Sequence, residues 1–151
     1  MFKRQIDKPF GEVLVERGAI DSKQLSLALD IQREKGGLIG EILVSLNFIT
    51  EEEIAQTLSL IYGFPFLPLN NYKISSELMD KVPKRVAEYY VVVPLDKIGN
   101  SITVAMSDPL NKNALEDIKY LTGDDTQVFI STKKDIVDAI NNAYGSPDTE
   151  K

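Results

Sequence analysis

Residues 10–29 read FGEVLVERGAIDSKQLSLAL, and residues 39–58 read IGEILVSLNFITEEEIAQTL. The two stretches align at a constant offset of 29 residues, from Gly11 to Gly40, with matching glutamate and aliphatic positions after each glycine. Self-similarity at a fixed offset marks units that pack against copies of themselves. Two copies are too few for a solenoid, which needs about three or more, so the pattern predicts a pseudo-symmetric lobe.

Each copy predicts a short apolar helix, a turn and a second helix. The second helices are expected to begin after Asp21 and Thr50, each followed three residues later by glutamine or glutamate, which is the spacing of a capping box. Apolar residues four apart in each second helix share one face, along which the copies are expected to pack: Leu25, Leu29, Ile54 and Leu58. The simplest interpretation is a helical bundle that binds no ligand.

The composition is typical of a globular protein, with 43% hydrophobic and 26% charged residues in a chain of 151. There is no run of 18 apolar residues and no signal-peptide pattern at the start, so the expected location is the cytoplasm, without insertion into a membrane. The net charge of −6 argues against nucleic acid as a partner.

Catalytic residue patterns are missing from the sequence. The chain has no histidine and no cysteine, which excludes Ser-His-Asp and Cys-His nucleophiles and the usual zinc ligand sets. No glycine-lysine-serine or glycine-lysine-threonine sequence is present, so there is no P-loop. We therefore expect a protein that is not an enzyme and that holds no metal.

A proline-punctuated stretch after Gly63 predicts the boundary between two lobes. The expected domains are a helical repeat lobe over 1–63, an α/β lobe over 64–145 and a disordered tail over 146–151. The second lobe reads as helices 74–81 and 83–89, strands 91–96 and 102–106, a helix from Asp108 to Leu121, strand 127–130 and helix 133–144. The predicted fold class is α+β, with an all-helical first lobe and a mixed three-stranded sheet in the second.

Several segments of the second lobe, taken in order, resemble a known family. They are YGFPF (62–66), the stretch from Pro83 to VPL (93–95), VAMSDP (104–109), Thr122-Gly123, and the end of the last helix at Tyr144-Gly145. The chain resembles the N-terminal domain of type II secretion and type IV pilus assembly ATPases, the MshEN domain. The resemblance covers nearly the whole chain.

This resemblance implies an interaction domain that couples a hexameric motor to the cytoplasmic part of an inner-membrane platform protein. The motor's P-loop is absent here, so the parent ATPase core would be a second partner if the sequence is an excised domain. A stand-alone scaffold outside the motor system is the other interpretation.

Some members of the family bind cyclic di-GMP through the repeats, so the resemblance also implies this dinucleotide as a regulatory ligand. The positions that match the family motif are Phe10, Gly11, Leu14, Gly18, Leu25, Leu29, Gln32, Ile39, Gly40, Leu43, Ile54 and Leu58, and Asp108 in the second lobe is a further candidate. Asp108 is equally explained as a helix cap.

The match to the binding motif is partial. The family's arginine is replaced by Pro9 in the first copy and by Leu38 in the second. The second glycine is replaced by Asn47, and the closing glutamine by Ile61, in the second copy. The apolar frame is thus kept while the guanidinium groups, which stack on guanine and donate planar hydrogen bonds, are lost. The glycines and leucines are also explained by packing of the lobe alone.

Overall fold

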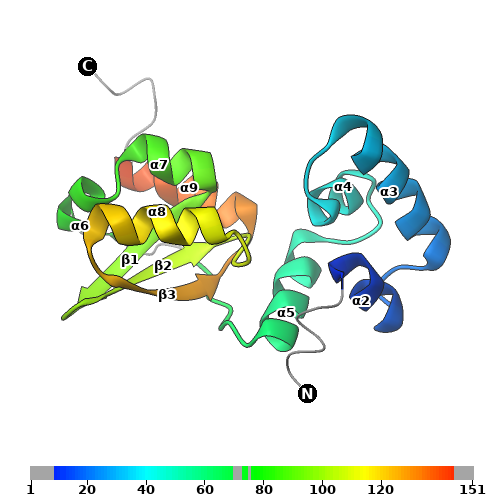
Figure 1. The fold of residues 1–151 in the computed structure, drawn as a ribbon, viewed down its shortest axis with the longest axis horizontal. Helices are drawn as coiled ribbons and strands as arrows, with labels where there is room; N and C mark the ends of the chain where they lie inside the picture. The colour runs from blue at the N-terminus through cyan, green and yellow to red at the C-terminus, as the bar shows by residue number, and fades with distance from the viewer. Residues whose placement is uncertain (1–8, 70–72, 75, 145–151) are drawn as a thin grey trace. The chain divides into compact units, whose positions relative to one another are not determined.

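The computed structural model describes residues 9–69, 73–74 and 76–144. It divides into two compact units, Met1–Gly63 and Phe64–Lys151 (Figure 1). In the described residues, the first unit is entirely helical and the second carries a sheet with helices packed on it. This arrangement confirms the predicted α+β class.

The first unit consists of α2 (Phe10–Glu16), α3 (Ser22–Lys35), α4 (Ile39–Ser45) and α5 (Glu51–Tyr62). Both longer helices begin with the predicted capping box. At α3 the Asp21 carboxylate accepts the amide hydrogen of Gln24 at 2.8 Å, and the Gln24 side chain accepts the amide hydrogen of Asp21 at 2.9 Å. Thr50 and Glu53 form the same reciprocal pair at α5, with distances of 3.1 and 3.0 Å.

The core of this unit draws on both halves of the sequence. Helix α3 packs against α2 and α4, and α5 packs against α4. The buried residues of the cluster are Leu14, Ile20, Ala28, Leu43 and Ile49. Leu14 and Leu43, at matching positions of the two short helices, are completely enclosed. Their burial holds the two helical pairs in one lobe.

The second unit follows the predicted order of elements. These are α6 (Ser76–Lys81), α7 (Lys84–Tyr90), β1 (Val92–Ile98), β2 (Ser101–Met106), α8 (Lys112–Thr122), β3 (Asp125–Ile130) and α9 (Lys133–Tyr144). β1 and β2 form an antiparallel hairpin, and β3 pairs with β2 in parallel. The strand order is β1-β2-β3. The sheet is mixed, as the sequence predicts.

The sheet carries a core on each face. Ile102, Val104 and Met106 of β2 pack with Ala114 and Ile118 of α8. On the other face, Ala105 packs with side chains of β1 and α9, namely Val93, Leu95, Ile136 and Ile140. Figure 1 shows α8 lying across one face of the sheet. The two-residue period of the strands thus sends alternate side chains into separate cores.

Both outer strands of the sheet have irregular pairing. The register of β1 against β2 shifts between Pro94 and Asp96. At the other side, the segment after Gly63 pairs with the end of β3: Leu67 donates its amide hydrogen to the Ile130 carbonyl at 2.9 Å, and Ile130 donates to the Pro65 carbonyl at 2.7 Å.

The predicted start of the long helix at Asp108 is wrong. Helix α8 begins at Lys112, and Asn111 is its N-cap, accepting the amide hydrogen of Ala114 at 3.1 Å. Asp108 instead accepts the amide hydrogen of Leu110 at 3.3 Å in a turn before the helix. Aspartate followed by proline fits such a turn as well as a helix start, and Asn111 is an equally good N-cap residue three positions later. Gly145 and the predicted tail 146–151 lie outside the described residues.

Candidate functional site

The glycines at the start of the two short helices have different surroundings. A Cβ atom built on Gly11 would lie 2.6 Å from Cδ1 of Leu25, whereas at Gly40 the nearest atom is Cδ1 of Ile54 at 3.5 Å. Gly11 is therefore packed against the helix that follows it, and the space beside Gly40 would hold a methyl group. The absence of a side chain at position 11 is accounted for by packing inside the lobe.

The candidate residues of the first unit fall into two groups by burial. Gly11, Leu14, Leu43 and Leu58 are buried, so they support the fold from within. The partly exposed candidates are Phe10, Leu25, Leu29, Gln32, Ile39, Gly40 and Ile54. Only this second group, together with the exposed Gly18, offers surface to a ligand. Phe10, Leu25, Ile39 and Ile54 also pack on the core cluster.

Gly18 and Asn47 occupy matching turns after the two short helices. Both have positive φ angles, 78° and 63°. The residue after each, Ala19 or Phe48, donates its amide hydrogen to the carbonyl five residues earlier, at 2.9 Å to Leu14 and at 3.1 Å to Leu43. Asparagine tolerates the left-handed conformation better than other side chains do, which explains how it replaces glycine without changing the turn.

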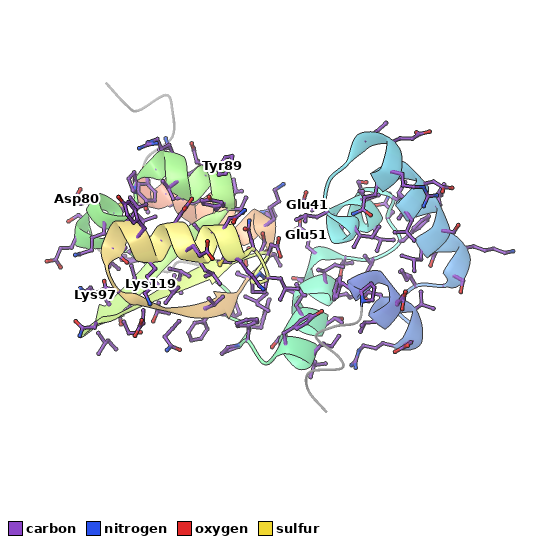
Figure 2. All side chains as sticks on the ribbon, viewed as in Figure 1. Glu41, Glu51, Asp80, Tyr89, Lys97 and Lys119 are labelled. Carbon is purple, nitrogen blue, oxygen red and sulfur yellow. The ribbon has the colours of Figure 1, made fainter. Side chains whose placement is uncertain are left out.

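The two arginine positions of the family motif fall at equivalent places in the structure. Pro9 and Leu38 stand directly before α2 and α4, as the N-cap residues, and neither caps its helix with a side chain. Both are exposed, and Leu38 leaves 47% of its surface in contact with solvent. The first turns of these helices carry the acidic residues Glu12 and Glu41. Glu41 is labelled in Figure 2.

The polar candidates around this frame have local partners. Gln32 donates from Nε2 to the carbonyl of Gly37 at 2.9 Å, which orders the turn between α3 and α4. Arg33 forms an ion pair with Asp30 on the same helix face. Ile61, at the position of the second glutamine, is buried. Asp108 lies in the second unit, in the turn before α8.

Two tyrosines of the second unit have shifted pKa values. The Tyr90 hydroxyl donates a hydrogen bond to the Asp117 carboxylate, which raises the pKa of Tyr90 to about 12. Burial raises the pKa of Tyr144 to about 12, and its hydroxyl donates to the carbonyl of Val82 at 2.6 Å. Both interactions join segments far apart in the sequence, so we interpret them as structural.

A hollow that the sequence did not predict lies between α7 and α9. Its volume is about 220 Å³, and it is lined by Glu88, Val91, Val137, Ile140 and Asn141. Tyr89 follows the lining residue Glu88 in the sequence, and its exposed side chain projects from α7 (Figure 2). Val91 has a φ of 53°, in the left-handed region that β-branched residues rarely adopt. The apolar positions of α9 that line the hollow are visible in the sequence, but they also fit an ordinary buried helix face.

The described ranges contain no group of three or more acidic, histidine or cysteine side chains arranged to hold a metal ion. In the same ranges, no helix has the length and hydrophobicity needed to cross a bilayer.

Residues 62–150, more than half of the chain, match the MshEN domain family, and the chain therefore belongs to this family. The match confirms the resemblance predicted from the sequence.

Similar proteins include motor ATPases. The chain is 37% identical to the type IV pilus assembly ATPase PilB of Myxococcus xanthus over 134 residues, which cover 89% of this chain and 24% of that relative. It is 30% identical to PilB of Thermus thermophilus over 140 residues, which cover 91% of this chain and 16% of that protein. The chain thus spans a quarter or less of these relatives.

Two solved structures share the fold. MshE with cdg (cyclic di-GMP) superposes with a TM-score of 0.78 and 26% identity, covering 91% of this chain and 99% of that one. The N-terminal domain of XpsE superposes with a TM-score of 0.77 and 20% identity, covering 89% of this chain and 92% of that one. The likeness to XpsE shows the same fold.

Proposed function

We propose that this chain is a non-catalytic regulatory and interaction domain of a secretion or type IV pilus motor ATPase, acting in the cytoplasm. The observation that carries the proposal is the alignment with PilB of Myxococcus xanthus over 89% of this chain, which takes in both units. The family match and the likeness to MshE support the same assignment. The chemistry of the motor would then belong to an ATPase core outside this sequence.

Its proposed partner is the cytoplasmic part of an inner-membrane platform protein. The acidic surface, with a net charge of −6, favours a basic partner segment through electrostatic steering. The test is a binding titration of the full chain with the purified cytoplasmic segment of the platform protein from the same genome. Saturable binding supports the proposal. No binding at high micromolar concentrations at low salt would contradict it.

A second candidate function is binding of cyclic di-GMP by the first unit. The observation that favours it is the likeness to MshE with cdg, together with the apolar frame around Phe10 and Ile39. The two N-cap positions before α2 and α4 would face matched halves of a two-fold ligand. Pro9 and Leu38 supply no donor there, and the Glu12 carboxylate in the first turn of α2 repels phosphate. Weak binding is therefore expected.

The arginine positions make this candidate directly testable. Calorimetric titration with cyclic di-GMP, with GTP as the control, compares the natural chain with Pro9→Arg, Leu38→Arg and the double variant. Each charge-assisted contact restored is expected to raise the affinity about ten- to hundred-fold. Gly40→Trp in the double variant should remove the gain. If the double variant binds no more tightly than the natural chain, the apolar frame serves packing alone.

A further inference from the structure

The hollow between α7 and α9 is small and partly open to solvent. Its volume is about 220 Å³, below the roughly 300–1,000 Å³ typical of small-molecule sites. A dry cavity of about 150 Å³ is enough to hold a benzene molecule. The hollow therefore suits one large apolar side chain, such as leucine or phenylalanine, and is too small for a dinucleotide.

Val91 forms part of the wall in a costly conformation. It ends α7, and its amide hydrogen is donated to the Ala87 carbonyl while its φ is 53°. Glycine or asparagine would hold the same turn with less strain. Valine instead presents an apolar surface, together with Val137 and Ile140 of α9. Backbone strain of this kind persists where the surroundings impose it, and it concentrates at functional surfaces.

The charges around the hollow favour a cationic neighbour. Glu88 lines the hollow and is exposed. On α9, Asp138 is paired with Lys134 at 3.0 Å, so its charge is compensated. Lys84 and Arg85 precede Glu88 on α7 by four and three residues, and within the described residues Glu88 forms no ion pair with either. Glu88 is therefore the acidic group at the hollow that would select a lysine or arginine, and the net negative charge of the whole chain acts in the same direction.

We infer that the hollow is the docking site for a basic segment of the partner protein. This segment inserts one large apolar side chain between Val91 and Val137 and places a lysine or arginine against Glu88. The inference rests on the proposed function, because it names the surface through which the platform protein would be engaged. A buried apolar anchor beside a charged rim is the usual arrangement of an interaction hot spot.

The experiment compares matched variants in the titration with the platform protein's cytoplasmic segment. Val137→Asp puts a charge into the hollow, and Leu121→Asp makes the same change at a similarly exposed position of α8. Val137 and Leu121 are 39% and 44% exposed. Glu88→Lys reverses the rim charge, and Glu116→Lys reverses an exposed charge on α8. Thermal unfolding of each variant verifies that it is folded.

We expect Val137→Asp to weaken binding at least about ten-fold and Glu88→Lys about five-fold, with both α8 variants within about two-fold of the natural chain. Equal effects of Val137→Asp and Leu121→Asp would overturn the docking site and leave the proposed function standing. Absence of binding by the natural chain would overturn both. Self-association in sedimentation that Val137→Asp abolishes would assign the hollow to a second copy and also overturn the inference.

Discussion

Cδ1 of Leu25 packs so closely on Gly11 that a Cβ atom at position 11 would lie 2.6 Å from it, while the equivalent distance at Gly40 is 3.5 Å, to Ile54. Two positions that match in sequence thus have different tolerance for a methyl group. The first glycine is in close contact with Leu25 on α3, whereas the second leaves ordinary van der Waals space beside Ile54.

The two glycines should respond differently to alanine. Gly11→Ala forces Leu25 to move and is expected to lower the free energy of unfolding by about 1 kcal/mol, at the low end of overpacking because the clash is with the end of a flexible side chain. Gly40→Ala should leave stability unchanged or raise it by up to about 1 kcal/mol, since alanine favours a helix. Urea unfolding monitored by circular dichroism measures both. Equal changes would show that position 11 has room for the methyl group.

The ion pair of Asp124, which lies two residues after α8, should contribute more to stability than the exposed ion pair of Asp125. Lys97 Nζ lies 3.1 Å from Oδ2 of Asp124, whose side chain is only 6% exposed. Asp124→Asn is expected to cost about 1–3 kcal/mol of unfolding free energy, toward the lower value because Lys97 retains access to water. The control, Asp125→Asn, removes the exposed pair with Lys119 and should cost less than about 0.5 kcal/mol. A larger loss for Asp125→Asn would contradict this order.

The N-caps of the two longer helices of the first unit should contribute similar stability. Asp21→Ala and Thr50→Ala each remove an acceptor for an amide hydrogen, at Gln24 and Glu53. Each is expected to cost about 1 kcal/mol in chemical unfolding. Ser26→Ala, at an exposed position within α3, is the control and should be neutral or slightly stabilising. A loss confined to one of the caps would show that the two helical pairs are not energetically equivalent.

Tyr144 should make stability fall at alkaline pH. Its folded pKa, about 12, lies above the ordinary value of 10.0, so between these values the folded chain holds a proton that the unfolded chain has released. The contribution is fully present below pH 10 and is lost as pH rises toward 12. Tyr144→Phe should flatten that part of the stability curve and cost about 1 kcal/mol at neutral pH through the lost bond to Val82.

Tyr90 titrates in the same range and provides the comparison. Its pKa is also raised to about 12, through the hydrogen bond to Asp117. The fall in unfolding free energy between pH 10 and 12 should therefore be smaller in each single phenylalanine variant and smaller again in the double variant. A slope between pH 10 and 12 that is unchanged in Tyr144→Phe would contradict the raised pKa of Tyr144.

Much of the fold follows from local signals in the sequence. The capping boxes at Asp21 and Thr50 and the hairpin turn after β1 are set by nearby residues, so they were predictable. The start of α8 was not, because Asp108-Pro109 and Asn111 both carry N-cap chemistry, and only the packing of Ala114 and Ile118 on the sheet selects the later start.

The candidate sites could be predicted from the sequence only in part. The motif positions of the first unit can be located from the sequence, but burial separates Leu14 and Leu43 from the accessible Phe10 and Ile39. The hollow beside Val91 depends on a left-handed residue and on the approach of α9 to α7. The apolar positions of α9 are visible in the sequence, but they fit an ordinary buried helix face equally well. Whether the frame binds cyclic di-GMP stays a prediction.

The borders of the three-stranded sheet limit how the second unit can recognise other chains. Pro94 lacks an amide hydrogen and lies beside a register shift in β1, while Pro65 and Leu67 occupy the hydrogen-bonding groups of Ile130 at the far side. Within the described ranges, the hydrogen-bonding groups are therefore interrupted at Pro94 in β1 and already used at Ile130 in β3. At these positions an incoming strand would find fewer hydrogen-bonding groups, which favours recognition through the helical surfaces, where side chains select the partner.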